Sequence, residues 1–379
     1  MTATHHVHGL AGEQVAPDWP ALTRDEVRAV LARLPTFAAH ADAAQLIWHS
    51  PRPLSAAARV CTPCGELFVK RHHQRVRTAQ ELIREHAFAA HLRARGVPTV
   101  EHLADENRCS AWTLGAWTYE ASRPASGEDS YRDTPSWTPL QDLDDARAAG
   151  RMLARLHRAA ADFPPVPRHA QVLVARDEWL RADDPLAFLQ QQCARRPGLA
   201  SYLADRDWRA ELAPLLPRHA RAHRQARTQP RRWTHNDWHV SNLFWRRNTQ
   251  GAEVATVLDF GLAAPTFPLY DLATAIERNA VEWLALPHGE ARAFPATARA
   301  LLAGYDEHMP LAAAERNALA ELLPVVHWDF ALSEVEYFEA IIGRRGDADV
   351  AWSVFLLGHT RWFDTAQGKA LLEAVRAPA

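Results

Sequence analysis

The chain has 379 residues, of which 47% are apolar and 23% charged, a composition typical of a soluble enzyme with one two-lobed unit or two domains. Its net charge of −2 gives no reason to expect binding to nucleic acid or to a membrane surface. No apolar run reaches the roughly 18 to 20 residues of a membrane helix, and the N-terminus lacks the charged and apolar regions of a signal peptide. A cytoplasmic protein is therefore expected. The sequence specifies no oligomeric state.

The charge is unevenly distributed along the chain. From Asp271 to the C-terminus there are 16 acidic and 9 basic residues, whereas the preceding 270 residues carry 29 acidic and 34 basic ones. A basic first part suits a polyphosphate ligand and an acidic last part suits a cationic substrate, although solvated helix faces give the same counts.

Four cysteines are present, and two of them form the motif Cys61-Thr62-Pro63-Cys64. A zinc site needs a second pair of ligands, and no nearby CxxC or HxxxH motif supplies one. A hairpin turn with reduced thiols is the better interpretation.

The first 120 residues predict a small β-rich lobe. Residues 1–22 are expected to be a flexible N-terminus, and Thr23 is expected to cap a helix that ends before Pro35. Alternating apolar patterns predict five antiparallel strands, and helical spacing with a Gly96 stop predicts one helix at Thr78–Arg95. The expected strands lie at residues 45–48, 58–61, 66–70, 110–114 and 117–120.

The rest of the chain is predicted to be mainly helical. Residues 121–127 are rich in small and turn-forming residues and are expected to form a linker, so that 23–120 make one lobe and 128–379 the other. Leu143–Ala160 has a buried apolar stripe, and further helical segments are expected at Trp179–Gln192 and Trp208–Thr228. Prolines at 197, 214 and 217 are expected to break these segments.

The most informative stretch runs from Trp233 to Gly261. It contains His235-x-Asp237-x-x-x-x-Asn242, then two strand-like runs around the turn Asn248-Thr249-Gln250-Gly251, then Asp259-Phe260-Gly261. A hairpin here returns the second strand alongside the first and brings Asp259 near Asn242. Phosphoryl transfer needs such a group of oxygen-bearing side chains, with one carboxylate to receive the hydroxyl proton and hard oxygen ligands for Mg²⁺. Either motif alone is common by chance, but both in this order and spacing point to a kinase-like site.

The segment His235-Asn236-Asp237-Trp238-His239-Val240-Ser241-Asn242 resembles the HGDxHxxN catalytic loop of the aminoglycoside phosphotransferase and choline kinase-like family. The resemblance covers about residues 45–290, and Asn236 departs from the usual Gly. It implies an α+β, protein-kinase-like two-lobed fold, with a small antiparallel β lobe carrying one helix and a larger, mainly helical lobe. It also implies ATP, with GTP as an alternative donor, and Mg²⁺ as cofactors, and a small-molecule substrate.

The same resemblance implies roles for individual residues. Asp237 would be the catalytic base, Asn242 and Asp259 the magnesium ligands, and His235 and Asp271 supporting residues, with Asp271 also placed to N-cap the helix after Asp-Phe-Gly. His157 would pack beneath the catalytic loop. For the nucleotide, the implied residues are Lys70 and its partner Glu85 (with Glu81 in reserve), Ser50 in the phosphate loop, and the backbone at Tyr119 and Ala121.

Two features leave alternatives open. The loop between the first two strands, His49–Ser55, has no glycine, which would suit a nucleotide-binding pseudokinase with a regulatory role. Asp329, Glu336 and Trp328 could line a pocket for an amine by charge and cation–π contact, but an amphipathic helix with a wet acidic face explains them equally well. A protein kinase is disfavoured, since no Ala-Pro-Glu follows Asp-Phe-Gly.

Overall fold

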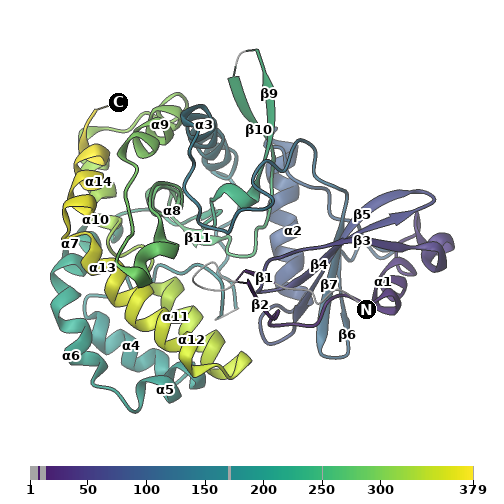
Figure 1. The fold of residues 1–379 in the computed structure, drawn as a ribbon, viewed down its shortest axis with the longest axis horizontal. Helices are drawn as coiled ribbons and strands as arrows, with labels where there is room; N and C mark the ends of the chain where they lie inside the picture. The colour runs from purple at the N-terminus through teal and green to yellow at the C-terminus, as the bar shows by residue number, and fades with distance from the viewer. Residues whose placement is uncertain (1–6, 9–13, 170–171, 250, 379) are drawn as a thin grey trace. The chain divides into compact units, whose positions relative to one another are not determined.

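The computed structural model describes residues 7–8, 14–169, 172–249 and 251–378, and the chain divides into two compact units (Figure 1). Unit 1 comprises Met1–Ala94 and Pro98–Ser126, and unit 2 comprises Arg95–Val97 and Gly127–Ala379. Unit 1 is the small β lobe of the predicted fold, and unit 2 is the larger, mainly helical lobe. Among the described residues, no helix is both long and apolar enough to cross a membrane.

Unit 1 is built on a five-stranded antiparallel sheet, as predicted. The strand order is β3-β4-β5-β7-β6, and each neighbouring pair is antiparallel. The strands are β3 (Gln45–His49), β4 (Ala56–Thr62), β5 (Gly65–His73), β6 (Ala111–Leu114) and β7 (Trp117–Ser122). Cys64 lies in the turn between β4 and β5, and all four cysteines are free thiols, so the hairpin interpretation of this motif is confirmed.

Helices α1 (Arg24–Leu31) and α2 (Ala79–Ala94) lie on opposite faces of this sheet. Successive side chains of a strand point to opposite faces. On β7, the Tyr119 hydroxyl donates to Glu26 of α1 at 2.7 Å, whereas Glu120 is 2.7 Å from His86 of α2. Lys70 of β5 is the cross-strand partner of Glu120, so it faces the α2 side.

The beginning of the chain is held more firmly than expected. The predicted cap of α1 is confirmed, because Thr23 and Glu26 form a reciprocal capping box. Trp19, within the stretch expected to be flexible, stacks on His73 with ring centroids 5.0 Å apart. Two short strands, β1 (Val7–His8) and β2 (Gln14–Val15), pair antiparallel. The remaining expectation for residues 1–22 lies outside the described residues.

Unit 2 is mainly helical, with two small strand pairs, β8–β11 and β9–β10. Its helices are α3 (Leu143–Ala159), α4 (Pro185–Cys193), α5 (Pro197–Leu203), α6 (Trp208–Leu212), α7 (Leu216–Ala226), α8 (Pro268–Ala280), α9 (Pro295–Asp306), α10 (Ala313–Leu322), α11 (Trp328–Glu336), α12 (Arg345–Val350), α13 (His359–Trp362) and α14 (Ala366–Arg376). Its strands are β8 (Arg232–Thr234), β9 (Leu243–Asn248), β10 (Gly251–Val257) and β11 (Ala264–Thr266). Two π-helical segments, Tyr337–Ile342 and Ala351–Gly358, extend α11 and precede α13.

The helical pattern differs from the prediction where prolines occur. The segment expected at Trp179–Gln192 begins as a helix only at Pro185, and Pro197 starts α5 rather than breaking a helix. Proline fits the first turn, where the backbone N–H has no partner within the helix. The segment expected at Trp208–Thr228 divides into α6, a 3₁₀ turn at Ala213–Leu215, and α7, and Pro214 and Pro217 both lie in first turns.

Helices α3 and α9 cross at very close range. A Cβ atom on Gly150 of α3 would lie 1.9 Å from the carbonyl oxygen of Leu301, and one on Gly304 of α9 would lie 1.9 Å from that of Arg147. Only glycine fits at both positions. The close crossing places His157 of α3 against Tyr305 of α9, with His157 Nδ1 2.8 Å from the tyrosine hydroxyl.

Replacing Gly304 by Ala should therefore destabilise the protein. The added methyl group would have to push a helix backbone aside, and we expect the free energy of unfolding to fall by about 1–3 kcal/mol. Gly346→Ala in α12 is the matched control, because a Cβ atom there would meet nothing within 4 Å. Urea unfolding of both variants checks this prediction, and equal stabilities would contradict it.

Candidate functional site

The predicted catalytic loop joins β8 to a short 3₁₀ turn at Val240–Asn242. Its second residue, Asn236, has φ 61°, the left-handed region that favours glycine but that asparagine tolerates better than other side chains. The Asn236 Oδ1 atom accepts hydrogen bonds from the hydroxyls of Thr234 and Thr266, each at 3.0 Å. The departure from the family's glycine is thus accommodated by a buried polar network that joins β8 to β11.

Asp271 holds this loop through its backbone. Its carboxylate is fully buried and accepts hydrogen bonds from the backbone N–H groups of His235 at 2.8 Å and Asn236 at 2.7 Å. The Oδ2 atom also lies 3.0 Å from His157 Nε2, which confirms the expected packing of His157 beneath the loop. The prediction that Asp271 would N-cap its helix is wrong. Pro268 starts α8 after Phe267, so Asp271 lies in the first turn and its carboxylate serves the loop instead.

His235 fixes the position of the loop from the other side. Its Nε2 donates to the carbonyl oxygen of Leu258 at 2.9 Å, and its Nδ1 accepts from the backbone N–H of Asp237 at 3.2 Å. These two bonds select one neutral tautomer of the ring. They also connect the loop directly to the end of the strand that leads to Asp259.

Asp237 is a buried carboxylate held by basic partners. Its Oδ1 atom accepts a hydrogen bond from the Arg278 guanidinium and lies 3.4 Å from His239 Nε2, while Oδ2 accepts from Asn242 Nδ2 at 3.0 Å. Burial by itself would raise the pKa of Asp237, but the charges of Arg278 and His239 outweigh it and hold the pKa below its usual value. Asp237 is therefore ionised at neutral pH.

Asn242 and Asp259 come together as predicted. The β9–β10 hairpin pairs Leu243 with Val257, and the Leu258 N–H donates to the Asn242 carbonyl at 2.8 Å, so Asp259 follows one residue later. The predicted turn residue Gln250 lies outside the described residues. The Asn242 amide nitrogen is committed to Asp237, which leaves its side-chain oxygen available for a cation. Asp259 is exposed, with φ 52°, and its Oδ1 accepts from the Gly261 N–H at 3.1 Å. An amide oxygen beside a carboxylate fits Mg²⁺.

The residues predicted to bind the nucleotide phosphates all lie in unit 1. Lys70 is on β5, and Glu81 and Glu85 are both buried on α2, one helical turn apart. Glu85 forms an ion pair with Arg77 at 3.1 Å. Ser50 is nearly buried, and its hydroxyl accepts from the Arg52 N–H at 3.3 Å, which shapes the glycine-free loop between β3 and β4.

The residues predicted to contact the adenine ring lie on β7. Strand β7 continues to Ser122, past the predicted strand end at residue 120, so Ala121 lies within the sheet rather than in the linker. Tyr119 is paired on both sides, with Arg71 and Trp112, and the Ala121 carbonyl accepts from the Leu103 N–H at 2.8 Å. The Ala121 carbonyl is therefore used inside unit 1, and the strand ends at Ser122.

The three residues predicted for an amine pocket have different surroundings. Trp328 donates to the Thr360 hydroxyl at 2.6 Å and packs on Trp179, and Glu336 forms a buried ion pair with Arg196 at 2.6 Å. Asp329 lines a small cavity of about 10 Å³, room for about one water molecule, and its Oδ2 has no partner among the described residues. Burial raises the pKa of Asp329 to about 6, against the opposing charges of Arg176 and Arg196.

A second group of residues beside Asp237 was not predicted. The Arg278 guanidinium packs on the rings of Trp137 and Phe330, 5.2 and 4.8 Å from their centroids. Its neighbour Glu277 approaches His327 at 3.4 Å and His359 at 3.2 Å, and all are buried. Arg278 is two helical turns after Asp271, so the sequence did place both on one face of α8. The histidines come from distant segments, and no local pattern indicates them.

Glu334 of α11 completes this group, which we call the α8–α11 acidic cluster (Glu277, His327, Glu334 and His359). Burial raises the pKa of Glu334 to about 8, although the Arg278 charge opposes the shift. Burial would also raise the pKa of Glu277, but His327 and His359 hold it below its usual value. Burial lowers the pKa of His359 to about 4, so that this ring is neutral.

Comparison with known proteins identifies the relatives of this fold. The model of the family described as "Phosphotransferase enzyme family" matches residues 55–314. A microcompartment-associated aminopropanol kinase is similar with a TM-score of 0.58 and 17% identity, over 92% of this chain and 98% of that chain. The amicoumacin kinase hAmiN, solved with AMP-PNP, Ca²⁺ and Ami, gives a TM-score of 0.56 and 12% identity, over 88% and 95%. An ethanolamine kinase from Plasmodium vivax gives 0.54 and 11%, over 94% and 88%. No curated protein sequence matches the chain.

Asp271→Asn should loosen the loop that carries Asp237. The NH₂ group of the new asparagine cannot accept a hydrogen bond. Either the His235 or the Asn236 backbone N–H would therefore lose its acceptor in a buried site. We expect the free energy of unfolding to fall by about 2–4 kcal/mol. Urea unfolding measures the change, and Asp133→Asn at an exposed position is the control. A variant as stable as its control would show that the Asp271 carboxylate does not hold the loop.

Proposed function

The chain belongs to the phosphotransferase enzyme family, and we propose that it transfers the γ-phosphoryl group of ATP to a hydroxyl group of a small molecule that carries an amine. The observation that carries the proposal is the pairing of Asp237 with Asn242 in a loop clamped by Asp271. This arrangement fixes a carboxylate and an amide oxygen beside Asp259. Within this proposal, the protein works as a small-molecule kinase.

Asp237 would orient the acceptor hydroxyl and receive its proton. Its low pKa makes it a weak base, but the loose transition state of phosphoryl transfer asks more for position and charge than for basicity. Arg278 keeps Asp237 ionised and in one position, and the rings of Trp137 and Phe330, which pack on its guanidinium, restrict that side chain in turn. His235 and Asp271 act through the backbone of the loop as positioning residues.

Asn242 and Asp259 would hold the magnesium ion, and Lys70 would bind the nucleotide phosphates. The ion supplies charge neutralisation for the phosphate oxygens when bound. The Asn242 oxygen is directed by the bond of its amide nitrogen to Asp237, so one contact sets both the base and a metal ligand. Contacts with the base of the nucleotide would come from the backbone near Tyr119 and Ala121, at the end of β7.

The acceptor molecule is proposed to carry an amine because the α8–α11 acidic cluster is rich in unpaired acceptors. Buried atoms without a hydrogen-bond partner among the described residues include Glu277 Oε2, Glu334 Oε2, His327 Nε2 and His359 Nδ1. His359 is neutral and its Nε2 contacts Glu277, so its Nδ1 is a lone-pair acceptor. Unpaired buried acceptors are costly, and an ammonium group would supply donors and charge together. Kinases of aminopropanol and ethanolamine, which share this fold, act on alcohols of this kind by name.

Turnover across a panel of amino-alcohols, sugars and aminoglycosides tests the proposed reaction, with ATP, GTP and Mg²⁺. We expect one amine-bearing alcohol to be phosphorylated, and Asp237→Asn to lower kcat by about 10²–10⁴-fold. Asparagine is preferred to alanine because it keeps the shape beside the buried Arg278.

The control is Asp133→Asn, which should keep full activity, and thermal unfolding verifies that both variants fold. Tight Mg-ATP binding without turnover on any acceptor would favour a regulatory pseudokinase. If neither binding nor turnover occurs, the proposed phosphotransfer is wrong.

Acceptor binding should depend on pH through Glu334. The carboxylate is mostly protonated below its pKa of about 8, and pairing with an ammonium group requires it to ionise. KM for the amine-bearing acceptor should therefore fall as pH rises from 6 to 8, by up to about tenfold per pH unit, and level off above 8. Glu334→Gln should give a high KM without this slope. A slope that persists in the variant would remove Glu334 from the acceptor site.

The raised pKa of Glu334 also makes the free energy of unfolding depend on pH. Because the pKa of Glu334 is higher in the folded than in the unfolded state, its contribution is fully present below the usual carboxyl pKa and is lost as pH rises toward 8. Urea unfolding at pH 5 and pH 8 should show a smaller difference for Glu334→Gln than for the parent protein.

A further inference from the structure

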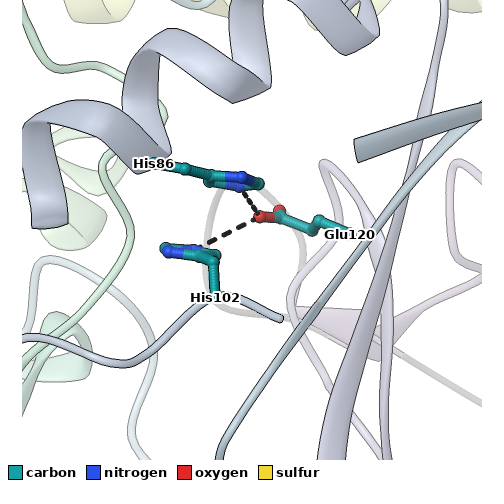
Figure 2. Close-up of side chains that lie close together, drawn as sticks. All are labelled: His86, His102 and Glu120. Atoms are coloured by element: carbon teal, nitrogen blue, oxygen red, sulfur yellow. Dashed lines mark hydrogen bonds and ion pairs between the residues drawn. The ribbon is translucent and has the colours of Figure 1, made fainter. Parts of the chain in front are cut away.

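Unit 1 contains a compact group of metal-ligand side chains that the proposed reaction does not use. His86 of α2, His102 of the segment after α2 and Glu120 of β7 form this His86–His102–Glu120 cluster (Figure 2). The Glu120 Oε2 atom lies 2.7 Å from His86 Nε2 and 3.6 Å from His102 Nε2. Their three ligand atoms lie within 4.8 Å of one another. Two imidazole nitrogens therefore face one carboxylate oxygen.

These separations are close to those of a zinc site. Bond lengths of about 2.0–2.2 Å from zinc to nitrogen and oxygen in a tetrahedron place neighbouring ligand atoms about 3.3 Å apart. The His86–Glu120 separation of 2.7 Å is shorter than this value, as in a hydrogen bond, and the His102–Glu120 separation of 3.6 Å is slightly longer. The His86 and His102 rings are stacked, with centroids 3.7 Å apart, so a modest rotation of each ring is needed for their lone pairs to converge.

Neighbouring side chains orient two of the three ligands. His72 Nε2 lies 2.9 Å from the Oε1 atom of Glu120, which leaves Oε2 toward the histidines. His86 Nε2 donates to Glu120 Oε2 at 2.7 Å, and its Nδ1 accepts from the Ser110 hydroxyl at 2.7 Å. A metal ion would take the place of the Nε2 proton, and Nδ1–H would then donate to Ser110. Metal-ligating histidines and carboxylates in proteins are oriented by outer hydrogen bonds of this kind.

A hydrogen-bond network alone does not account for His102. Its contact with Glu120 at 3.6 Å is too long for a hydrogen bond, and its ring makes none with the described residues. The His102 side chain is 14% exposed and lies beside a carboxylate without a hydrogen bond to it, an arrangement that suits a metal ligand.

We propose that the His86–His102–Glu120 cluster binds one Zn²⁺ ion, through the two Nε2 atoms and Glu120 Oε2, with water in the fourth position. The ion would join α2 to β7 within unit 1. Because Lys70 is the cross-strand partner of Glu120 and Glu81 and Glu85 lie on α2, occupancy would fix the helix beside the lysine assigned to the nucleotide. Nearby Lys70 and Arg93 oppose a divalent cation, so we expect micromolar rather than tighter affinity.

Titration with Zn²⁺, and with Co²⁺ as a spectroscopic probe, tests this site on the full chain. His5, His6 and His8 are replaced by Ala in all proteins, because their spacing near the N-terminus could bind metal independently. We expect one ion per chain and an intense visible Co²⁺ spectrum typical of tetrahedral coordination. His102→Asn and Glu120→Gln should weaken binding by about 100-fold or more, and His72→Gln by about 10-fold.

His91→Ala is the matched control, since it removes another histidine from α2 outside the cluster and should leave binding unchanged. Zn²⁺ should raise the melting temperature of the parent protein and of His91→Ala, but not that of His102→Asn. This second measurement separates loss of the site from a folding defect, since His102→Asn must melt cooperatively without metal. Binding of equal strength in His102→Asn, or no stoichiometric binding to the parent, would overturn the proposal.

Discussion

The catalytic loop of this protein depends on one buried carboxylate. Asp271 accepts hydrogen bonds from two consecutive backbone N–H groups, at His235 and Asn236, and a third contact comes from His157. Charge-assisted bonds to backbone donors are stronger than neutral ones, and a buried carboxylate is stable only when its acceptor capacity is used. The loop conformation and the burial of Asp271 therefore require each other. The left-handed Asn236 is held in the same place by two threonine hydroxyls.

The close packing of α3 against α9 is connected to the loop through contacts with the Asp271 carboxylate. Gly150 and Gly304 let α3 and α9 approach until backbone meets backbone, and His157 and Tyr305 meet beside that crossing. His157 then contacts Asp271, which holds the loop. A chain of contacts thus runs from a helix crossing to the backbone of Asp237, and every member of the chain is buried. Interiors packed at this density transmit small shifts, so the crossing and the loop geometry are expected to be coupled.

The sequence predicted what depends on local pattern. Alternation gave the five strands of unit 1, turn residues gave the β9–β10 hairpin, and motif spacing brought Asn242 and Asp259 together. The predictions were wrong where a residue forms hydrogen bonds with a residue distant in the sequence. Asp271 reads as a helix cap by position, but its carboxylate bonds a loop 35 residues earlier. Ala121 was predicted to begin the linker, but pairing with β5 and a hydrogen bond from Leu103 extend the strand past it.

The clusters of histidine and glutamate were beyond sequence reasoning for the same reason. His86, His102 and Glu120 come from a helix, a connecting segment and a strand, and only the folded sheet brings them together. The same holds for Glu277, His327 and His359 in unit 2. Residues within one loop have a fixed spacing along the sequence and can be recognised by it. Ligands supplied by three separate elements have no such spacing and cannot be predicted in this way.

Helix α8 carries residues that hold the loop and also a residue of the proposed acceptor site. Asp271 in its first turn holds the catalytic loop, and Arg278, two turns later, holds Asp237 itself. Glu277 on the same helix meets side chains from α11 and α13. The part of the site that must stay constant for chemistry is therefore supplied by α8. The proposed amine site is completed by His327, Glu334 and His359 from later segments. Substitutions in those later segments can change which amine is accepted without moving Asp237, because the clamp on the loop does not pass through them.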